Sequence, residues 1–187
     1  LTATGLTTIA VPVDYQGVRE PTSGGAALDA LMVTPAHQFP MGVVLSPERR
    51  ARLVDWAAAT GALLLEDDYD AEYRYDRQPV GALQGLAPDH TVYAGSVSKT
   101  LAPGLRLGWL VVPDGIAAGV VAAKQRDDLG TPVVEQLALA DFLERGELDR
   151  HLRRTRGVYR RRRDRLVEAL RRHIPECEPT GVAAGDR

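Results

Sequence analysis

The chain has 187 residues, of which 44% are hydrophobic and 26% are charged, and its formal net charge at pH 7 is −2. This composition excludes a disordered chain and predicts a soluble globular protein with a buried core. The small negative charge excludes a general attraction to nucleic acid or to an acidic membrane surface, so DNA binding would need a local patch or a further domain.

The single cysteine, Cys177, cannot form an internal disulfide, and no Cys/His group has the spacing of metal ligands. No apolar run approaches the length of a membrane span, and no signal-type segment opens the chain. These features predict a cytoplasmic protein. The chain opens at Leu1 without a start methionine, and residues 180–187 read as the start of a new element, so we interpret it as an internal fragment.

Short apolar runs alternate with helical patterns, which is typical of a mainly parallel sheet covered by helices. Residues 7–13 and 28–33 are expected to form strands. Ser46-Pro47-Glu48 then predicts a helix start, because serine caps the first turn, proline fits its first position and an acid favours the helix dipole. We expect this helix to continue to about Thr60 and to end at Gly61.

Two further apolar runs lead directly into polar residues. Residues 62–65 form a predicted buried strand that ends in the acids 66–68, and residues 91–94 form another that is followed by Ser96-Val97-Ser98-Lys99. A third apolar run covers residues 106–112. Because open α/β sheets bind ligands at the carboxyl ends of their strands, Asp67 and Lys99 are expected to meet at one site.

From Pro132 the pattern becomes helical, with helices expected over residues 133–144 and 147–173 and a break at Gly146. The second helix contains the arginine run 160–163 and could be mistaken for a DNA-reading helix. An amphipathic apolar stripe and the acids Asp164 and Glu168 favour a solvated or interdomain helix instead.

The segment from Ser96 to Arg106 contains one of only two lysines in the chain. A lysine that forms a Schiff base must lose its proton. The planar guanidinium of Arg106 is suited to a phosphate, and a turn at Pro103-Gly104 would bring Arg106 back toward Lys99. Ser96 and Ser98 are two positions apart, so both hydroxyls can face one phosphate. The spacing predicts a site for a phosphorylated aldehyde cofactor, although a solvated Arg106 and turn-forming serines remain the alternative.

Asp67 is the candidate partner of a pyridine nitrogen in such a cofactor. The pyridine ring withdraws electrons only while its nitrogen stays protonated, and a buried carboxylate beside that nitrogen ensures this. Tyr69 would share a side of an extended chain with Asp67 and could donate its phenol to the ring oxygen. The alternatives are an acid that only caps a turn and an ordinary core tyrosine.

At this point the residues resemble a family. Residues 34–42, 66–75 and 96–108, in this order, resemble the aminotransferase-like effector domain of MocR-type regulators in the GntR superfamily. Nearly the whole chain is similar to the large domain of fold type I, pyridoxal-phosphate-dependent class I and II aminotransferases. The resemblance implies an α/β fold like that of aspartate aminotransferase, with a mainly parallel sheet and flanking helices.

The resemblance also implies a domain organisation. Residues 1–145 would be part of the large domain, and residues 146–187 would be a long interdomain helix and the start of a small domain. A winged helix-turn-helix domain is expected upstream of this chain, so any DNA contact would be made outside it. A homodimer is expected as well.

For the site, the resemblance implies that Lys99 binds pyridoxal 5′-phosphate covalently. Asp67 would contact the pyridine nitrogen, and Tyr69 would contact the ring oxygen. The phosphate would be bound by Ser96, Ser98 and Arg106. One departure is that the chain has no asparagine, and residues 39–42 replace the Asn-Pro-x-Gly motif of ordinary aminotransferases. MocR-type proteins share this variation, and His37 or Gln38 is the candidate for the missing polar contact.

Three functions stay open at this point. The first is a cofactor-binding sensor domain of a transcriptional regulator that responds to an amino acid, another amine or the cofactor itself. The second is an aminotransferase that moves an amino group from an amino acid to a 2-oxo acid, or that completes only half of this reaction. The third is a cofactor-free dimerisation scaffold.

Overall fold

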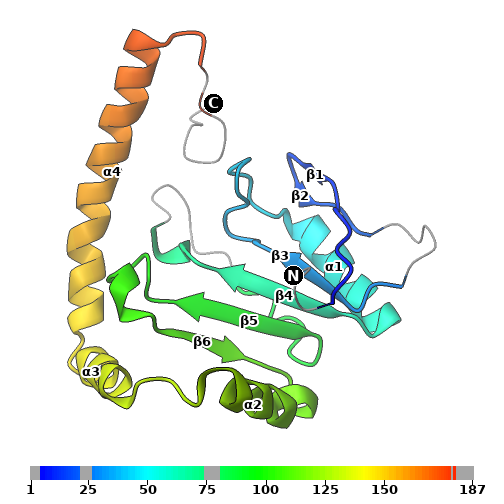
Figure 1. Ribbon diagram of the computed structural model, residues 1–187. Coiled ribbons are helices and arrows are strands. Elements are labelled where there is room, and N and C mark those ends of the chain that lie inside the picture. Colours follow the sequence, from blue (N-terminus) through cyan, green and yellow to red (C-terminus); the bar gives the residue numbers. More distant parts are fainter. Residues whose placement is uncertain (1–4, 22–26, 74–80, 178, 180–187) are drawn as a thin grey trace.

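The computed structural model describes residues 5–21, 27–73, 81–177 and 179. These residues form a small hairpin, a four-stranded sheet and helices around it (Figure 1). The elements in chain order are β1 Val13–Asp14, β2 Gly17–Val18, β3 Ala30–Val33, α1 Pro47–Thr60, β4 Leu63–Asp68, η2 Ala71–Tyr73, β5 Thr91–Ser96, η3 Pro103–Leu105, β6 Gly108–Val111, α2 Asp114–Asp128, α3 Val133–Glu144 and α4 Glu147–His173.

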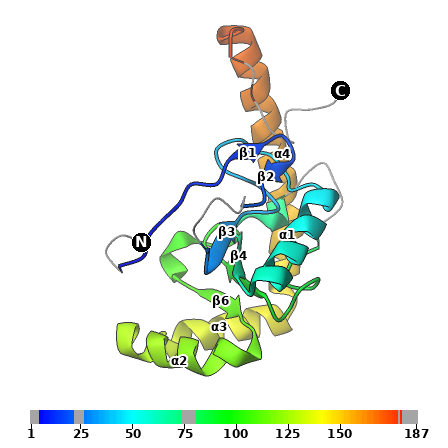
Figure 2. The same ribbon diagram turned by 90° about the vertical axis from the view of Figure 1, so that its right-hand side faces the viewer.

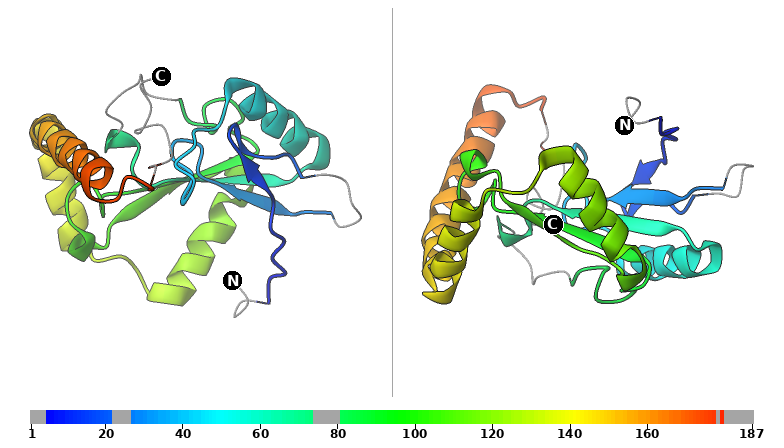
Figure 3. Two further views of the ribbon diagram at one scale, coloured as in Figure 1. Left: turned by 90° about the horizontal axis from the view of Figure 1, so that it is seen from above. Right: turned by 60° about the horizontal axis from the view of Figure 1, so that its bottom comes forward.

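The sheet has the strand order β3-β4-β5-β6. Strands β3, β4 and β5 are parallel, and β6 is antiparallel to β5, which confirms the predicted mainly parallel sheet. Parallel neighbours end at the same edge, and in Figure 1 the strands β4 and β5 point toward α4. Helices α1 and α2 lie on opposite faces of the sheet (Figure 3).

Helix α1 begins and ends where its sequence predicts. The Ser46 hydroxyl accepts a hydrogen bond from the Arg49 backbone N–H, and Pro47 occupies the first turn. Gly61 ends the helix in the left-handed conformation with φ of 73°, which a glycine adopts without steric cost. The core lies between α1 and the strands β3 and β4, and its buried residues are Leu31, Val33, Leu45, Leu53, Ala57, Leu64 and Leu83.

Two strand predictions need correction. The predicted strand over residues 7–13 is wrong, because residues 6–12 form no strand and only Val13–Asp14 pairs, in a two-residue hairpin with Gly17–Val18. Pro12 has no backbone N–H to donate to a ladder. Strand β4 is longer than residues 62–65, since Glu66 pairs with Tyr93 and Asp68 with Gly95. Backbone ladder bonds need no apolar side chain, so the strand continues through the acids.

Helix α2 was not predicted from the sequence. None of its described side chains is fully buried. Ile116, Ala117, Val120 and Ala123 are half-buried at helical spacing, but Ala118, Val121 and Ala122 are exposed, so apolar residues are not confined to one side. Helix periodicity therefore gave only a weak signal over Asp114–Asp128.

Helix α4 spans Glu147–His173 as predicted and extends beyond the sheet (Figure 2). Its apolar side carries Leu152, which is buried, and Tyr159, which packs against Tyr73 of η2. Most arginines of α4 are exposed on its other sides. No helix among the described residues is long and apolar enough to cross a bilayer.

Candidate functional site

The predicted site residues come from three loops at one edge of the sheet. Strand β4 ends with Asp68, strand β5 ends with Ser96, and Ser96 pairs with Gly108 at the start of β6. Asp67 is paired with Ala94, one position before the end of β4. The register therefore places the two segments that the sequence assigns to one site next to each other. His37 reaches this edge from the loop after β3, since its ring contacts Asp70.

The segment after β5 turns back on itself, as Pro103-Gly104 predicted. The Ser98 N–H donates to the Ser96 hydroxyl oxygen at 3.0 Å, and the Leu101 N–H donates to the Val97 carbonyl at 2.8 Å. The Val97 N–H in turn donates to the Leu107 carbonyl at 3.2 Å, which returns the chain to its starting point. Residues 97–101 are called the Lys99 turn below.

Arg106 and Lys99 are both exposed around this turn. Arg106 follows η3 and has φ of 52°, a left-handed conformation that is uncommon for a residue with a side chain. The next residue, Leu107, is the one bonded to Val97. The bond between Leu107 and Val97 thus places the backbone of Arg106 close to Ser96, in the region where the sequence predicts a phosphate.

The residue after Lys99 makes contacts that were not predicted from the sequence. Thr100 is buried, and its carbonyl oxygen accepts hydrogen bonds from the Tyr73 hydroxyl at 3.2 Å and the His151 Nε2 at 2.8 Å. His151 lies 51 positions along the chain, on α4. No motif connects these residues, so only the fold reveals the contact.

The carboxylates at the end of β4 have different surroundings. Glu66 is buried, and its two oxygens accept hydrogen bonds from the Leu83 and Gln84 backbone N–H groups. Asp68 accepts a hydrogen bond from the Tyr93 hydroxyl at 2.8 Å. Of the three acids, Asp67 alone receives no hydrogen bond from any described residue.

Burial raises the pKa of Asp67 above its ordinary value, and the carboxylates of Asp68 and Asp70 raise it further. An acid in this state is stabilised by a positively charged N–H donor beside it. A protonated pyridine nitrogen is such a donor, so the unsatisfied charge of Asp67 fits the predicted cofactor.

Tyr69 and His37 form a small cluster with Asp70. The Tyr69 hydroxyl donates to the His37 carbonyl oxygen at 3.0 Å, and the His37 Nδ1 lies 2.7 Å from the Asp70 carboxylate. Burial, followed by the negative charges of Asp70 and Asp67, raises the pKa of Tyr69, so the phenol keeps its proton at neutral pH. The predicted roles of His37 and Tyr69 toward a cofactor remain predictions, but both residues lie in the loops of this edge.

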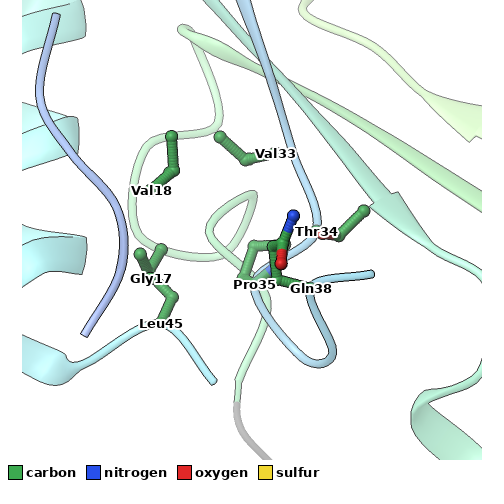
Figure 4. A pocket seen from close by; sticks show the side chains of 7 residues that line it. All are labelled: Gly17, Val18, Val33, Thr34, Pro35, Gln38 and Leu45. Carbon is green, nitrogen blue, oxygen red and sulfur yellow. The ribbon is translucent and has the colours of Figure 1, made fainter. Parts of the chain in front are cut away.

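A separate pocket lies between the β1–β2 hairpin and the loop after β3 (Figure 4). Its lining is mostly apolar, and Gln38 is the only residue of the lining that the sequence analysis considered as a cofactor contact. The lining residues are Gly17, Val18, Val33, Thr34, Pro35, Gln38 and Leu45.

The donor set at the sheet edge suits one kind of ligand. It offers a reachable primary amine at Lys99, a guanidinium at Arg106, hydroxyls at Ser96 and Ser98, and an unpaired carboxylate at Asp67. An aldehyde reacts with the amine, a phosphate pairs with the guanidinium and hydroxyls, and a protonated ring nitrogen pairs with the carboxylate. The residues present therefore fit pyridoxal 5′-phosphate. The last two residues of the motif 66–75 lie outside the described residues.

Comparison with known proteins agrees with these chemical features. Residues 11–184 match the family model "Aminotransferase class I and II". The HTH-type pyridoxine biosynthesis transcriptional regulator PdxR of Corynebacterium glutamicum is 43% identical over 168 residues, which are 89% of this chain and 36% of the regulator. The probable rhizopine catabolism regulatory protein MocR of Rhizobium meliloti is 35% identical over 94% of this chain and 36% of its own length. The chain thus spans about a third of these relatives.

A solved structure gives the same result for the fold. The kynurenine aminotransferase of Pyrococcus horikoshii, determined in complex with PMP, matches with a TM-score of 0.83 and 33% identity. The match covers 92% of this chain and 46% of that enzyme.

Proposed function

Because the chain belongs to the aminotransferase class I and II family, we propose that its sheet edge with Asp67, Lys99 and Arg106 binds pyridoxal 5′-phosphate. The predicted fold class is confirmed by the match to aminotransferase structures. The observation that carries the proposal is the convergence of Asp67 and the Lys99 turn at adjacent, parallel strand ends.

Each residue has a distinct task in this proposal. When bound, the cofactor supplies an electron sink for bonds at the carbon that carries the amino group. Lys99 would hold the aldehyde carbon covalently, and its amine would move a proton at the α-carbon of a bound amino acid. Asp67 would keep the proton on the pyridine nitrogen. Tyr69 would turn its hydroxyl from the His37 carbonyl to donate to the ring oxygen. The phosphate is held by Ser96, Ser98 and Arg106.

The biological role that we propose is that of an effector domain in a GntR/MocR-type transcriptional regulator. The regulators PdxR and MocR support this role, since they are 43% and 35% identical to the chain. DNA would be bound by a winged helix-turn-helix domain outside this chain, and an amino acid or another amine would be the effector. The protein would act in the cytoplasm as a homodimer. Residues 1–145 would belong to the large domain, and residues 146–187 would lead into the small one.

The alternative is a complete aminotransferase. The similarity to the Pyrococcus horikoshii enzyme favours it, and the same residues would serve both roles. Turnover would require the first 2-oxo acid product to leave and a second 2-oxo acid to enter and accept the amino group, which a sensor does not need.

Covalent binding is tested by visible absorption of the intact protein with added pyridoxal 5′-phosphate. The parent and a Lys124→Ala control are expected to show a Schiff-base band that Lys99→Ala lacks. Lys124 is a matched control because it lies on α2 and pairs with Asp128, away from the sheet edge. A band in Lys99→Ala that Lys124→Ala lacks would move the covalent site to α2.

The two roles are separated by two measurements on the same protein. A regulator changes its affinity for its own promoter when cofactor and amines are added, whereas an aminotransferase converts amino acid and 2-oxo acid over many cycles. Unchanged promoter binding together with repeated turnover would favour the enzyme.

A further inference from the structure

We propose that His151 of α4 and Tyr73 of η2 are positioning residues for Lys99, which they hold through the carbonyl of Thr100. The two residues would also connect the cofactor lysine to α4. This inference rests on the proposed function of Lys99 and adds two residues to which no cofactor motif gives a role.

The first observation is that two donors converge on one buried oxygen. The Thr100 side chain is buried, and its carbonyl accepts from the Tyr73 hydroxyl at 3.2 Å and from His151 Nε2 at 2.8 Å. A carbonyl oxygen has two acceptor sites, so both are filled by side chains from other elements. Because the oxygen can only accept, His151 must carry its proton on Nε2.

The second observation is that the Lys99 side chain has no hydrogen-bonding partner of its own among the described residues. The Lys99 side chain is exposed and makes no hydrogen bond or ion pair with a described residue. Its starting position is therefore set by the backbone of the turn. That backbone is held on one side by the bond from the Leu101 N–H to the Val97 carbonyl and on the other by the Thr100 carbonyl.

The third observation is that the two donors are themselves joined. The rings of Tyr73 and Tyr159 pack edge to face at 5.0 Å, and the Arg156 Nε donates to the Glu72 carbonyl at 2.6 Å. The Thr155 hydroxyl lies 3.5 Å from the Tyr73 hydroxyl and donates to the His151 carbonyl. Residues 151–159 of α4, η2 and the Lys99 turn thus form one connected unit.

This connection predicts coupling in both directions. A change in the backbone at Lys99 alters the Thr100 carbonyl and so reaches α4, and a shift of α4 reaches Lys99 with the same free energy. If an amine releases Lys99 from the cofactor, α4 is the element that receives the change first. As the predicted interdomain helix, α4 would carry the change to the next domain.

The test uses the intact protein, three variants of the two donors and two control variants. His151→Ala removes one donor and Tyr73→Phe removes the other, whereas His151→Gln retains an N–H donor. The controls are His173→Ala, at the exposed end of α4, and Tyr15→Phe, which is 83% exposed. Far-UV circular dichroism confirms that each variant is folded.

The first readout is hydrogen exchange of residues 97–105 in the cofactor-free protein. Loss of one hydrogen bond is expected to speed this exchange by about 3- to 10-fold in His151→Ala and in Tyr73→Phe. The controls should exchange like the parent, and His151→Gln should recover most of the protection. Equal exchange in all variants would overturn the proposal.

The second readout is the pH midpoint of the visible band in the cofactor-loaded protein. Both donor-removing variants are expected to shift it, because a displaced lysine sits in a different electrostatic environment. Hydrogen exchange in α4 should also respond to an added amine in the parent and not in these variants. A parent without a visible band would refute the proposed function of Lys99, while the cofactor-free exchange would still decide the positioning role.

Discussion

Asp67 and Glu66 are neighbours on β4, but their carboxyl groups have different hydrogen-bond surroundings. Burial raises the pKa of both carboxyls, but two backbone N–H groups oppose the rise at Glu66 and nothing opposes it at Asp67. A buried acid with two donors is satisfied within the fold, whereas one without donors needs a partner from outside. The difference separates a structural acid from a candidate ligand-binding acid.

Asp67→Asn should therefore leave the cofactor-free protein as stable as the parent, or more stable, at pH 8. A raised carboxyl pKa contributes stability below the ordinary value of 3.8, and this contribution is lost as pH rises through the folded-state pKa. An asparagine does not titrate, so the stability advantage of the variant over the parent should shrink as the pH is lowered toward 4. The affinity of the variant for the cofactor should fall. Urea unfolding at both pH values measures the stability. A variant that is less stable than the parent at pH 8 would show that Asp67 already has a cationic partner.

Glu66→Gln should behave in the opposite way. Each oxygen of Glu66 accepts one backbone N–H, and an amide replaces one of those acceptors with a second donor. One buried N–H then loses its partner, which costs about 1–3 kcal/mol of unfolding free energy. Urea unfolding at pH 7 measures the cost. Stability equal to the parent would mean that the Leu83 or Gln84 N–H finds another acceptor.

The single residues that the sequence identifies best are those whose chemistry is unusual for their position. A lysine followed by a proline–glycine turn and an arginine, and an acid at a strand end, can be proposed as site residues without knowledge of the fold. The bond between His151 and Thr100 cannot, because it joins two ordinary residues that are 51 positions apart. The contact between the His37 Nδ1 and the Asp70 carboxylate cannot be predicted for the same reason.

At the scale of elements, local signals decide which predictions succeed. Helix α1 has its cap, its proline, its buried stripe and its terminal glycine within one short segment, so both its ends were predicted correctly. Strand β4 extends into its acids because the neighbours β3 and β5 complete its ladder, which a single segment does not reveal. Helix α2 fully buries no side chain and carries apolar residues on more than one side, so its periodic pattern is weak.

Gly95 shows how closely β5 and β6 depend on each other. A Cβ atom at this position would lie 2.4 Å from ring atoms of Trp109, so Gly95→Ala must displace the indole or separate the strands. We expect a loss of about 1–3 kcal/mol in unfolding free energy and a shift of tryptophan fluorescence. Gly119→Ala is the control, since its new methyl group on α2 meets no atom within 4 Å. Equal stability of both variants would mean that Trp109 moves away at no cost.

At the scale of the whole molecule, the described surface has a large apolar area. On β6, Trp109, Leu110 and Val111 are 42–55% exposed, and on α3, Val134 and Leu137 are 76% and 65% exposed. Apolar patches of this kind bind partners or cause self-association. The sheet edge of the site is polar by contrast, so the two surfaces serve different purposes.

The chain of residues 1–187, produced by itself, should therefore bind a hydrophobic dye and elute as a species larger than its 20.3 kDa mass. The double variant Val134→Ser and Leu137→Ser should reduce both effects, because it removes two of the most exposed apolar groups of α3. Size-exclusion chromatography with light scattering measures the mass. A monomer without dye binding would show that these side chains are tolerated in water.

The arginines of α4 affect how the molecule binds to ion-exchange resins. Eleven arginines and four acids lie between Glu147 and His173, whereas 12 of the basic and 21 of the acidic residues lie elsewhere. A chain of net charge −2 is thus strongly polarised, with its positive end on the helix that extends from the sheet. On a chromatography column at pH 7 it should adhere to sulfonated beads as well as to quaternary-amine beads, in opposite orientations.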